Sequence, residues 1–343
     1  MVTSSYEDAA PERVEAMFAA GGALEVWSAG AQAMALLEAV HDAGWLGFLA
    51  EPRDLAALVG FTGLAAPQVE DVLDALAAHG IVEHDAGLVR LAPAFALLSA
   101  DDAPHDLAEL LAYRAMLPRR VRAAVTTAPG DRLDGEDALV TAKALGGRVT
   151  PVSRTLFRGL ADLLPEYRVL AEGGRLLDVG CGVGWAMLDL ATLYPAARQT
   201  GIELVPEVAA ETERRARALG VQDRVEVRCQ DARTYDAEES FDVAFWAQPF
   251  FPEPARPGTL QMIRRALRPE GVLIMQELFV RPEDDDEAAT RRFALTRLLY
   301  RHQGVRFAPS AEHLSDEAAA AGFEPVRVEA TPLGRLIVMR RPA

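Results

Sequence analysis

The sequence predicts a doubly wound α/β fold with a mostly parallel sheet in its second half, preceded by a helical first half. After residue 165, strand-like apolar runs alternate with helical stretches, a pattern that specifies a parallel sheet with helices on both faces. One of these runs ends in a glycine-rich turn, Asp178-x-Gly180-x-Gly182-x-Gly184, directly before a helix. The last two strand candidates read instead as an antiparallel hairpin.

The chain of 343 residues is long enough for one large domain or two smaller ones, and we expect domains at 1–165 and 166–343. A formal net charge of -16 repels phosphate backbones and anionic lipids, which argues against nucleic acid and membrane partners. Cys181 and Cys229 show no disulfide or metal-ligand spacing, which is typical of a cytoplasmic protein. We also expect no signal peptide and no membrane span.

The first hundred residues are predicted to be helices followed by a hairpin. Apolar residues fall at helix spacing over 11–49, where Gly21-Gly22 and Gly44 punctuate the pattern. A short helix at 54–59 is expected to end at Gly60, and an amphipathic helix follows at 68–79. Short strands at 81–84 and 88–91 complete an order that is typical of a winged-helix module.

Winged helices often bind DNA, but the charges of this one contradict that function. The helix that would enter a groove carries Glu70, Asp71 and Asp74 and has no Lys or Arg. Such a face cannot neutralise phosphates. We therefore expect the module to pack against another subunit or to cover a site, and keep a winged-helix regulator as the less favoured alternative.

Helical patterns continue from 103 to 164. One helix is expected to break at Pro118, a loop to follow over 127–135, and another helix to open at Thr150-Pro151 and run to Leu164. Three side chains here, Tyr113, Met116 and Phe157, are candidates for lining a substrate pocket, although plain helix packing explains them equally well.

The second half supplies the strands of the predicted sheet. Strands are expected at 175–179, 199–203, 224–229, 241–246 and 272–278, helices at 186–193, 206–219 and 258–267, and the hairpin at 323–330 and 335–340. This gives seven strands, of which the last pair is antiparallel.

The glycine-rich turn is suited to a nucleotide-like ligand, because glycines let the backbone approach and the helix N-terminus offers free N–H groups. A dinucleotide turn needs G-x-G-x-x-G, and the third glycine position holds Trp185 in one register and Met187 in the other. The turn also lacks the Lys-Ser/Thr of a P-loop.

What stands resembles the glycine-rich motif of class I S-adenosylmethionine-dependent methyltransferases, which have a Rossmann-like fold. Glu203 at the end of the second strand, Asp231 after the third and the fourth strand at 241–246 fit the same resemblance. It implies that Glu203 accepts hydrogen bonds from the ribose diol and that Asp231 meets the adenine amino group of S-adenosylmethionine. The candidate cofactor-binding residues are Asp178, Gly180, Gly182, Gly184, Glu203, Leu204, Asp231, Ala232 and Trp246. From its placement just before the cofactor strand, Arg154 or Arg158 is a candidate to meet the methionine carboxylate.

With its helical first half, nearly the whole chain is similar to the small-molecule O-methyltransferases of plants and of bacterial natural-product pathways. The family's Gly-Phe pattern before the last hairpin is present as Ala321-Gly322-Phe323. The resemblance implies a homodimer formed through the first domain, which also helps to close the substrate site. It implies a small, aromatic or polyketide-type acceptor, and the candidate contacts in the second half are Phe250, Phe251, Phe293 and Tyr300.

The chain departs from the family where many members carry a catalytic His-Asp pair, because Pro249 and Phe250 occupy those positions. The family's Glu at the end of the fifth strand does match, as Glu277, and the catalytic candidates are His302, Glu277 and Gln248. Three readings stay open: methyl transfer helped mainly by proximity, His302 as a replacement base, or another reaction such as cyclisation or hydroxylation. C- or N-methylation also remains an alternative to O-methylation.

No metal is expected. Some relatives bind iron through His residues, one of them near Pro249, and this chain lacks that His. The acidic run 283–287 is expected to begin a helix, with its acids at the positive end and Arg291, Arg292, Arg297 and Arg301 further along.

Overall fold

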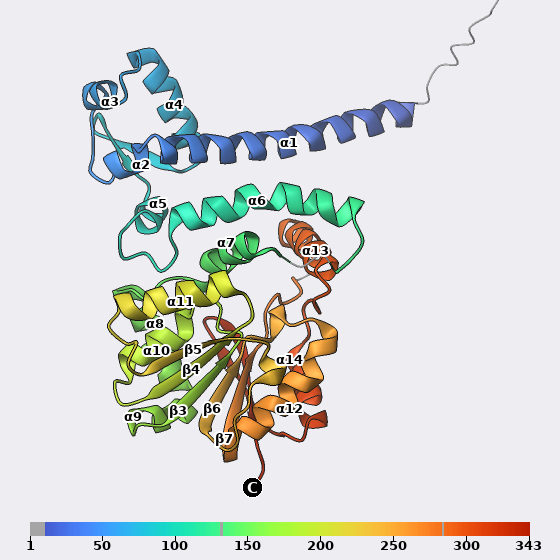
Figure 1. The fold of residues 1–343 in the computed structure, drawn as a ribbon. Helices are drawn as coiled ribbons and strands as arrows, with labels where there is room; N and C mark the ends of the chain where they lie inside the picture. The colour runs from blue at the N-terminus through green and yellow to red at the C-terminus, as the bar shows by residue number, and fades with distance from the viewer. Residues whose placement is uncertain (1–10, 131–132, 283–284) are drawn as a thin grey trace, which may run out of the picture. The chain divides into compact units, whose positions relative to one another are not determined.

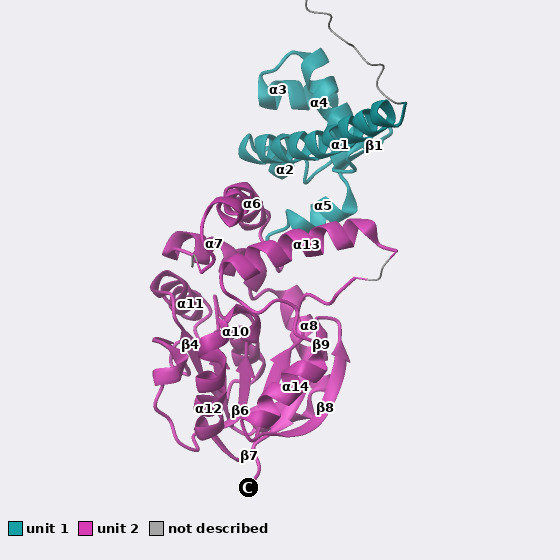
Figure 2. Cartoon of the chain, turned by 90° about the vertical axis from the view of Figure 1, so that its right-hand side faces the viewer, with its two compact units in different colours: residues 1–101 teal, residues 102–343 magenta. Residues whose placement is uncertain are grey.

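The computed structural model describes residues 11–130, 133–282 and 285–343, and the chain forms two compact units. They comprise residues 1–101 and 102–343 (Figure 2). The sequence placed the end of the first domain at residue 165. The helices between 102 and 165 belong instead to the compact unit that contains the large sheet.

The first unit consists of helices and one hairpin, in the order that the sequence predicts. Its elements are α1 (Pro11–Asp42), α2 (Trp45–Phe48), α3 (Leu55–Thr62), α4 (Ala66–Ala78), β1 (Val82–Asp85), β2 (Leu88–Leu91) and α5 (Pro93–Leu98). The strands pair in antiparallel register, with Val82 opposite Leu91. Leu58, Val69, Leu73 and Leu76 are buried in this unit, so the apolar face predicted for α4 is the face it buries.

Two boundaries in this unit differ from the sequence-based prediction. Gly21 and Gly22 do not interrupt α1, because glycine costs a helix only about 1 kcal/mol and leaves helical dihedral angles available. Helix α3 does not end at Gly60 but continues to Thr62. Gly63 terminates it in a left-handed conformation, with φ of 69° and its N–H on the carbonyl of Val59.

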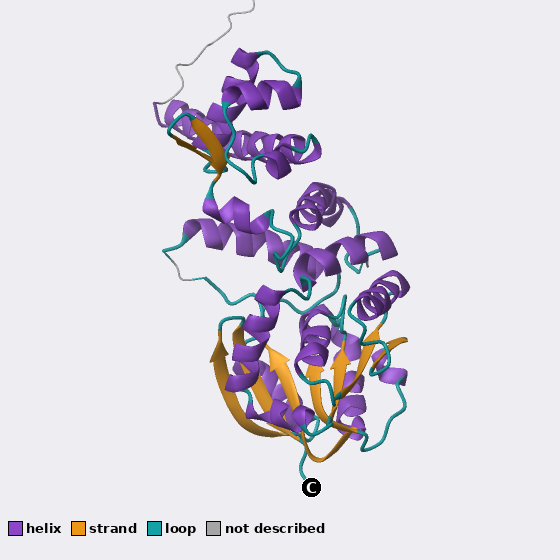
Figure 3. Ribbon diagram, turned by 90° about the vertical axis from the view of Figure 1, so that its left-hand side faces the viewer, coloured by secondary structure: helices purple, strands orange, loops and turns teal. Residues whose placement is uncertain are grey.

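In the described part of the chain, the second unit builds one sheet of seven strands (Figures 1 and 3). Their order is β5-β4-β3-β6-β7-β9-β8, parallel except at β9, which runs antiparallel to both of its neighbours. The strands are β3 (Arg175–Val179), β4 (Arg198–Glu203), β5 (Val225–Cys229), β6 (Phe241–Trp246), β7 (Leu267–Gln276), β8 (Glu324–Thr331) and β9 (Gly334–Arg340).

Alternate residues of the strands supply the two faces of the sheet. Leu177 and Ala244 pack in one cluster with Leu260 of α12 (Arg256–Ala266) and Leu314 of α14 (Ala311–Ala320). Their neighbours Leu176 and Val243 pack in another cluster, with residues of α8 (Pro151–Leu163) and α10 (Trp185–Leu193). The doubly wound arrangement predicted from the alternating pattern is confirmed.

The remaining helices are α6 (Leu107–Thr126), α7 (Gly135–Gly146), α9 (Arg168–Ala171), α11 (Pro206–Ala218) and α13 (Glu287–His302). Helix α6 does not break at Pro118: it continues to Thr126, because buried Leu111 and Met116 before the proline and Arg120 after it hold both parts. Helix α7, which lies between the predicted loop at 127–135 and the predicted helix start at Thr150, was not predicted. The acidic run does start a helix, with Asp286 capping α13 at the N–H of Ala289; residues 283–284 lie outside the described residues.

Strand β9 lies between β7 and β8, so the last hairpin completes the sheet. Arg335 at its start donates two hydrogen bonds to Glu277, which directly follows β7. Gly322, with φ of 91°, turns the chain into this hairpin, and Phe323 is buried. Among the described helices, none combines the length and the hydropathy that crossing a bilayer requires.

Candidate functional site

The candidate site lies at the carboxyl ends of β3, β4, β5 and β6. Successive strands are added outward from β3 to β4 and β5, and the chain then returns to place β6 on the other side of β3. In sheets of this kind, ligands bind in the crevice outside the carboxyl ends at such a switch point. The glycine-rich turn follows β3 directly, so the topology places it in that crevice.

The backbone of the turn is held in a conformation that favours glycine. Gly180, Gly182 and Gly184 have φ of 77°, 57° and 77°. The N–H groups of Gly180 and Cys181 both donate to the carbonyl of Ile202 on β4, at 2.8 and 3.1 Å. A Cβ on Gly180 would lie 2.7 Å from the ring of Phe251, so this glycine also makes room for an aromatic side chain.

Thr212 of α11 fastens the turn from the other side, and the sequence analysis missed this residue. Its hydroxyl donates to the carbonyl of Gly182 at 2.5 Å, and it is fully buried. Its methyl group lies so close to Gly184 that a Cβ there would approach it to 2.6 Å. No local motif marks a helical threonine as a partner of a distant turn, so only the fold reveals it.

Glu203 ends β4 and turns its carboxylate towards the glycine-rich turn. Its oxygens accept hydrogen bonds from the N–H groups of Gly182, Leu204 and Val205, at 3.1, 2.8 and 2.9 Å. Burial raises the pKa of Glu203, and these three N–H donors oppose that rise by stabilising the charged form. The carboxylate is thus preorganised at the crevice.

Asp178 is the other acidic group of the crevice. It is buried at the end of β3, and its Oδ1 has no hydrogen-bond partner among the described residues. Burial, helped by the nearby charge of Glu203, raises the pKa of Asp178 to about 7. A buried polar atom without a partner is costly, so a ligand able to donate to it has an energetic reason to bind there.

Asp231 follows β5 and begins a short turn that contains buried Ala232. Its carboxylate accepts from Arg233, with the shortest contact at 2.6 Å from Nη2, and it is partly exposed. Leu204, next to Glu203, exposes 51% of its surface. An exposed apolar side chain next to a carboxylate offers a surface on which a ring can pack.

Residues 146–149, which we name the strap, pack on the glycine-rich turn. A Cβ on Gly146 would lie 2.6 Å from Val183, and one on Gly147 would lie 2.9 Å from the ring of Trp185. Such close approaches require glycine at both positions. The strap was not recognised in the sequence.

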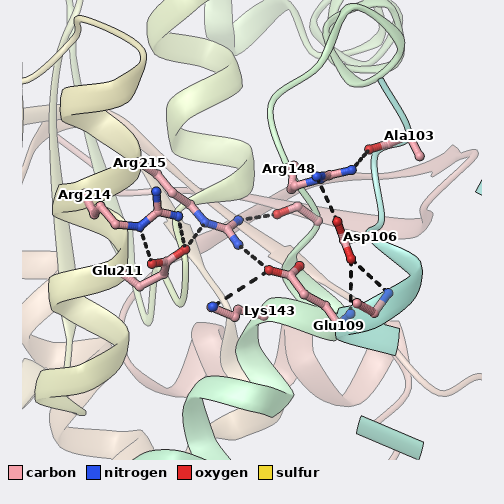
Figure 4. Close-up of polar contacts among 10 residues, drawn as sticks. Ala103, Asp106, Glu109, Lys143, Arg148, Glu211, Arg214 and Arg215 are labelled. Carbon is pink, nitrogen blue, oxygen red and sulfur yellow. Dashed lines mark hydrogen bonds and ion pairs between the residues drawn. The ribbon is translucent and has the colours of Figure 1, made fainter. Parts of the chain in front are cut away.

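Ionic contacts hold the strap in place (Figure 4). Arg215 of α11 donates to the carbonyl of Gly147, pairs with Glu211 at 2.8 Å, and lies 3.6 Å from Glu109 of α6. Arg148 of the strap pairs with Asp106 at 3.0 Å and donates to the carbonyl of Ala103. Burial would raise the pKa of Glu211, but the hydrogen bonds from Arg214 and Arg215 prevail and lower it to about 2.

Two predicted site residues at the end of β6 face the core. Trp246 is fully buried with residues of α12 and α14, and its ring lies 4.8 Å from the guanidinium of Arg256. Gln248 is also fully buried, and its amide donates to the carbonyl of Gln276 at 3.0 Å. These contacts describe packing at the base of the crevice.

Glu277 and His302, the other catalytic candidates, have structural partners. Glu277 binds Arg335 with both oxygens and accepts from the N–H of Ala311, the first residue of α14. His302 lies 3.0 Å from the hydroxyl of Thr127, which donates to the carbonyl of Ala123.

The predicted aromatic contacts form a continuous wall. Phe251 lies against Gly180, and Phe250 lies beside Tyr300 of α13, with ring centroids 6.1 Å apart. Tyr300 is buried, and burial raises the pKa of its hydroxyl far above the usual range. The wall continues from Tyr300 to Phe279 and Phe307, at 4.7 and 5.7 Å, and from Phe307 to Phe293 at 4.9 Å.

The candidates from the helices before the sheet lie in varied surroundings. Phe157 is buried edge-on against Trp185, 5.3 Å between centroids, and Met116 is buried in α6. Tyr113 is half-buried, which raises the pKa of its hydroxyl. Arg154 is exposed on α8. Burial raises the pKa of Asp189 to about 7, and the charge of Arg154 opposes part of that rise.

Two further observations delimit the site. Within the described ranges, no group of three His, Cys, Asp or Glu side chains is arranged to hold a metal. A hollow of about 630 Å³ lies at the opposite edge of the sheet, next to Glu239 before β6 and Arg341 after β9. It is far from the chemistry of the turn, and Arg341 and Glu239 pair with each other there.

The topology and the turn define the class I methyltransferase fold. Residues 176–271 match a family model described as a methyltransferase domain. Residues 176–271 thus have the sequence pattern of a methyltransferase domain, which confirms the resemblance inferred from the turn.

Solved structures of methyltransferases share the fold over nearly the whole chain. Among curated proteins, sterol 4-C-methyltransferase strm-1 of Caenorhabditis elegans is 28% identical over 207 residues, which are 60% of this chain and 59% of the relative. The chain thus spans less than two thirds of that relative. Among solved structures, mitomycin 7-O-methyltransferase MmcR has a TM-score of 0.64 at 19% identity, over 96% of this chain and 99% of that one. Human N-acetylserotonin methyltransferase, solved with S-adenosylmethionine, has a TM-score of 0.69 at 18% identity, over 94% and 98%.

Proposed function

We propose that the protein is an S-adenosylmethionine-dependent methyltransferase that methylates an oxygen of a small, aromatic or polyketide-type natural-product intermediate. The observation that carries this proposal is the glycine-rich turn at the switch point of the sheet, with Asp178 at its start and the carboxylate of Glu203 bonded to the N–H of Gly182. Oxygen is the favoured acceptor atom because the whole chain shares its fold with proteins named O-methyltransferases.

The residues of the crevice fit this cofactor. Glu203 offers carboxylate oxygens for a ribose diol, Leu204 offers an exposed apolar face for a purine, and Asp231 follows as an acceptor for an amino group. The unpartnered Oδ1 of Asp178 can accept a hydrogen bond. When bound, the cofactor supplies a methyl group on a positively charged sulfur. We also place Gly180, Gly182, Gly184, Ala232, Trp246 and Arg154 in or around this site.

The chain contributes to the reaction chiefly by orienting and enclosing the cofactor and the acceptor. Glu203, Leu204 and Asp231 would hold the cofactor at the crevice, and the cofactor would supply the methyl group to an acceptor bound beside it. Holding the reactants in line can by itself supply about 7–11 kcal/mol of the barrier. We assign the wall from Phe251 to Phe293, together with Tyr113, Met116 and Phe157, to the acceptor side.

Of the catalytic candidates, His302 is the one that could serve as a base, because Arg335 binds both carboxylate oxygens of Glu277. Its Nε2 forms a hydrogen bond with the hydroxyl of Thr127. However, His302 lies two residues after Tyr300, about 200° round the helix, and Tyr300 is the residue that joins the aromatic wall. We therefore favour transfer by proximity, with Glu277 and Gln248 as supports of the site.

We also propose that the first unit, a winged-helix module, is a dimerisation element in a cytoplasmic homodimer and that residues 1–165 help to cover the acceptor. Helix α1 exposes 62–70% of Met17, Phe18, Leu24, Val26 and Trp27, a large apolar surface for a second copy of the chain. The acids of α4, Glu70, Asp71 and Asp74, argue against binding nucleic acid. Light scattering after gel filtration tests the dimer.

Calorimetry with S-adenosylhomocysteine tests the cofactor assignment. We expect binding in the micromolar range or tighter, and Glu203→Ala and Asp231→Ala should each weaken it. Arg217→Gln, an exposed change on α11, is the matched control. Absence of binding to the folded protein would rule out the proposed function.

A further inference from the structure

Beside α13 the structure contains a small hollow of about 190 Å³, and none of its lining residues belongs to the cofactor crevice. Its lining is aromatic and aliphatic, except for one charged side chain, Arg292, and one hydroxyl, Thr296. The aromatic members are Phe279, Phe293 and Phe307. Of these, only Phe293 was singled out from the sequence.

A series of aromatic contacts links the hollow to the edge of the sheet that carries the proposed methyl-transfer site. Phe279 follows β7 by three residues, and β7 is parallel to β3, so both strands end at the same edge of the sheet. The rings of Phe250, Tyr300 and Phe279 connect this edge to the hollow, with centroid separations of 6.1 and 4.7 Å.

The backbone at Phe279 is strained. This residue has φ of 60°, a left-handed conformation that bulky side chains rarely adopt. Ala308, next to Phe307 across the hollow, has φ of 53°. The rings of Phe279 and Phe307 are stacked, 5.0 Å apart and 26° from parallel. Strain of this kind persists where surrounding structure fixes a side chain, and it is concentrated at ligand-binding sites.

Arg292 gives the hollow its polarity. It is exposed, and among the described residues its guanidinium has no carboxylate partner. Its neighbour Arg291 differs: it pairs with Glu287 at 2.6 Å and does not line the hollow. A lone guanidinium at the rim of an aromatic pocket suits a carboxylate, which it binds through two parallel hydrogen bonds.

We propose that this hollow is the acceptor pocket and that it selects a flat aromatic molecule carrying a carboxylate, with the ring against the cluster of Phe279, Phe293 and Phe307 and the carboxylate on Arg292. This inference rests on the proposed function and names the substrate class for the same site. The volume is below the roughly 300–1,000 Å³ of drug-sized ligand sites, so it fits an acceptor of one or two fused rings.

The test uses the full chain with saturating S-adenosylhomocysteine and naphthalene carboxylate as the probe, with binding measured by calorimetry. Naphthyl methanol keeps the ring without the charge, and cyclohexane carboxylate keeps the charge without the aromatic ring. We expect the naphthalene carboxylate to bind at least about tenfold more tightly than either, because only it satisfies both elements of the pocket.

Two variants separate the elements. Arg292→Gln should weaken the binding of naphthalene carboxylate by about tenfold and leave the affinity for naphthyl methanol unchanged. The control Arg291→Gln should change neither affinity. Phe279→Leu, which keeps apolar bulk, should weaken both naphthalene compounds while thermal unfolding confirms that the variant is folded. Equal binding of all three probes, or an unchanged affinity in Arg292→Gln, would overturn the proposal.

The outcome is separable from that of the proposed function. Binding of S-adenosylhomocysteine without selective binding of the probe overturns the pocket and leaves the methyltransferase assignment standing. Selective, Arg292-dependent binding of the probe without any S-adenosylhomocysteine binding supports the pocket and refutes the assignment.

Discussion

The hydroxyl of Thr212 donates to the carbonyl oxygen of Gly182 at 2.5 Å, so that one side chain of α11 fixes the centre of the glycine-rich turn. Thr212→Val keeps the shape and the methyl group but removes the donor. We expect it to lower the free energy of unfolding by about 1–2 kcal/mol and to weaken S-adenosylhomocysteine binding. Thr212→Ser, which keeps the hydroxyl, is the control. Equal affinities in calorimetry for wild type and Thr212→Val would contradict this role.

Arg215 should control cofactor affinity through the strap. Arg215→Gln removes its ion pair with Glu211 and weakens its hold on Gly147, so the strap covers the turn less firmly. We expect S-adenosylhomocysteine to bind about tenfold more weakly, and amides of residues 146–149 to exchange hydrogen faster. Arg217→Gln on the same helix removes only an exposed pair with Glu213 and should have no effect. Unchanged hydrogen exchange at residues 146–149 in Arg215→Gln would show that Arg215 does not hold the strap.

The buried carboxyl of Asp178 makes stability depend on pH. Its pKa is about 7 in the folded chain against an ordinary value of 3.8, so folding favours the protonated form. This contribution is fully present below pH 3.8 and is lost as the pH rises through about 7. The melting temperature of the protein without ligand should therefore fall across that interval. Asp189, with a pKa also about 7, acts with the same sign, so Asp178→Asn should flatten the profile only in part.

Gly180 should tolerate no side chain. Gly180→Ala places a Cβ 2.7 Å from the ring of Phe251 at a φ of 77°, so both the turn and the aromatic wall must shift. We expect loss of S-adenosylhomocysteine binding and a destabilisation of about 1–3 kcal/mol. Gly159→Ala in α8 meets nothing within 4 Å among the described residues and should stabilise the protein by roughly 0.5–1 kcal/mol. Denaturant unfolding compares the two.

His302→Ala tests the remaining base candidate. Because its Nε2 bonds to Thr127 at the end of α6, we expect a lower melting temperature. Once an acceptor is found, the rate should fall by less than about tenfold and the pH–rate profile should keep its shape. A general base contributes about 10²–10⁴-fold, so a loss in that range with an altered profile would assign His302 the proton transfer.

The turn and the strands of the sheet were predictable because their signals are local. Positive φ demands glycine at 180, 182 and 184, and apolar alternation marks both faces of each strand. Helix ends were less predictable: Gly60 and Gly63 are equally plausible stops, and only packing chooses between them. Pro118 similarly lies within α6 because buried neighbours outweigh its missing hydrogen bond.

The candidate site was predictable only where it follows the ends of strands. Asp178, Glu203 and Asp231 come directly after apolar runs, and the fold brings them to one edge. Trp246 and Gln248 also lie at this edge, but their side chains point into the core, and strand-end position does not determine that. Thr212, Arg215 and Phe279 escaped notice because their importance depends on contacts with distant residues.

The position of β9 between β7 and β8 has a consequence for synthesis. Strand β8 is made first but pairs only with β9, so it has no partner in the sheet until the chain has been made past Arg340. Arg335 of β9 also holds Glu277, from which the chain leads to Phe279. The contact that holds Glu277 thus forms only after the glycine-rich turn and its strands have been available for folding.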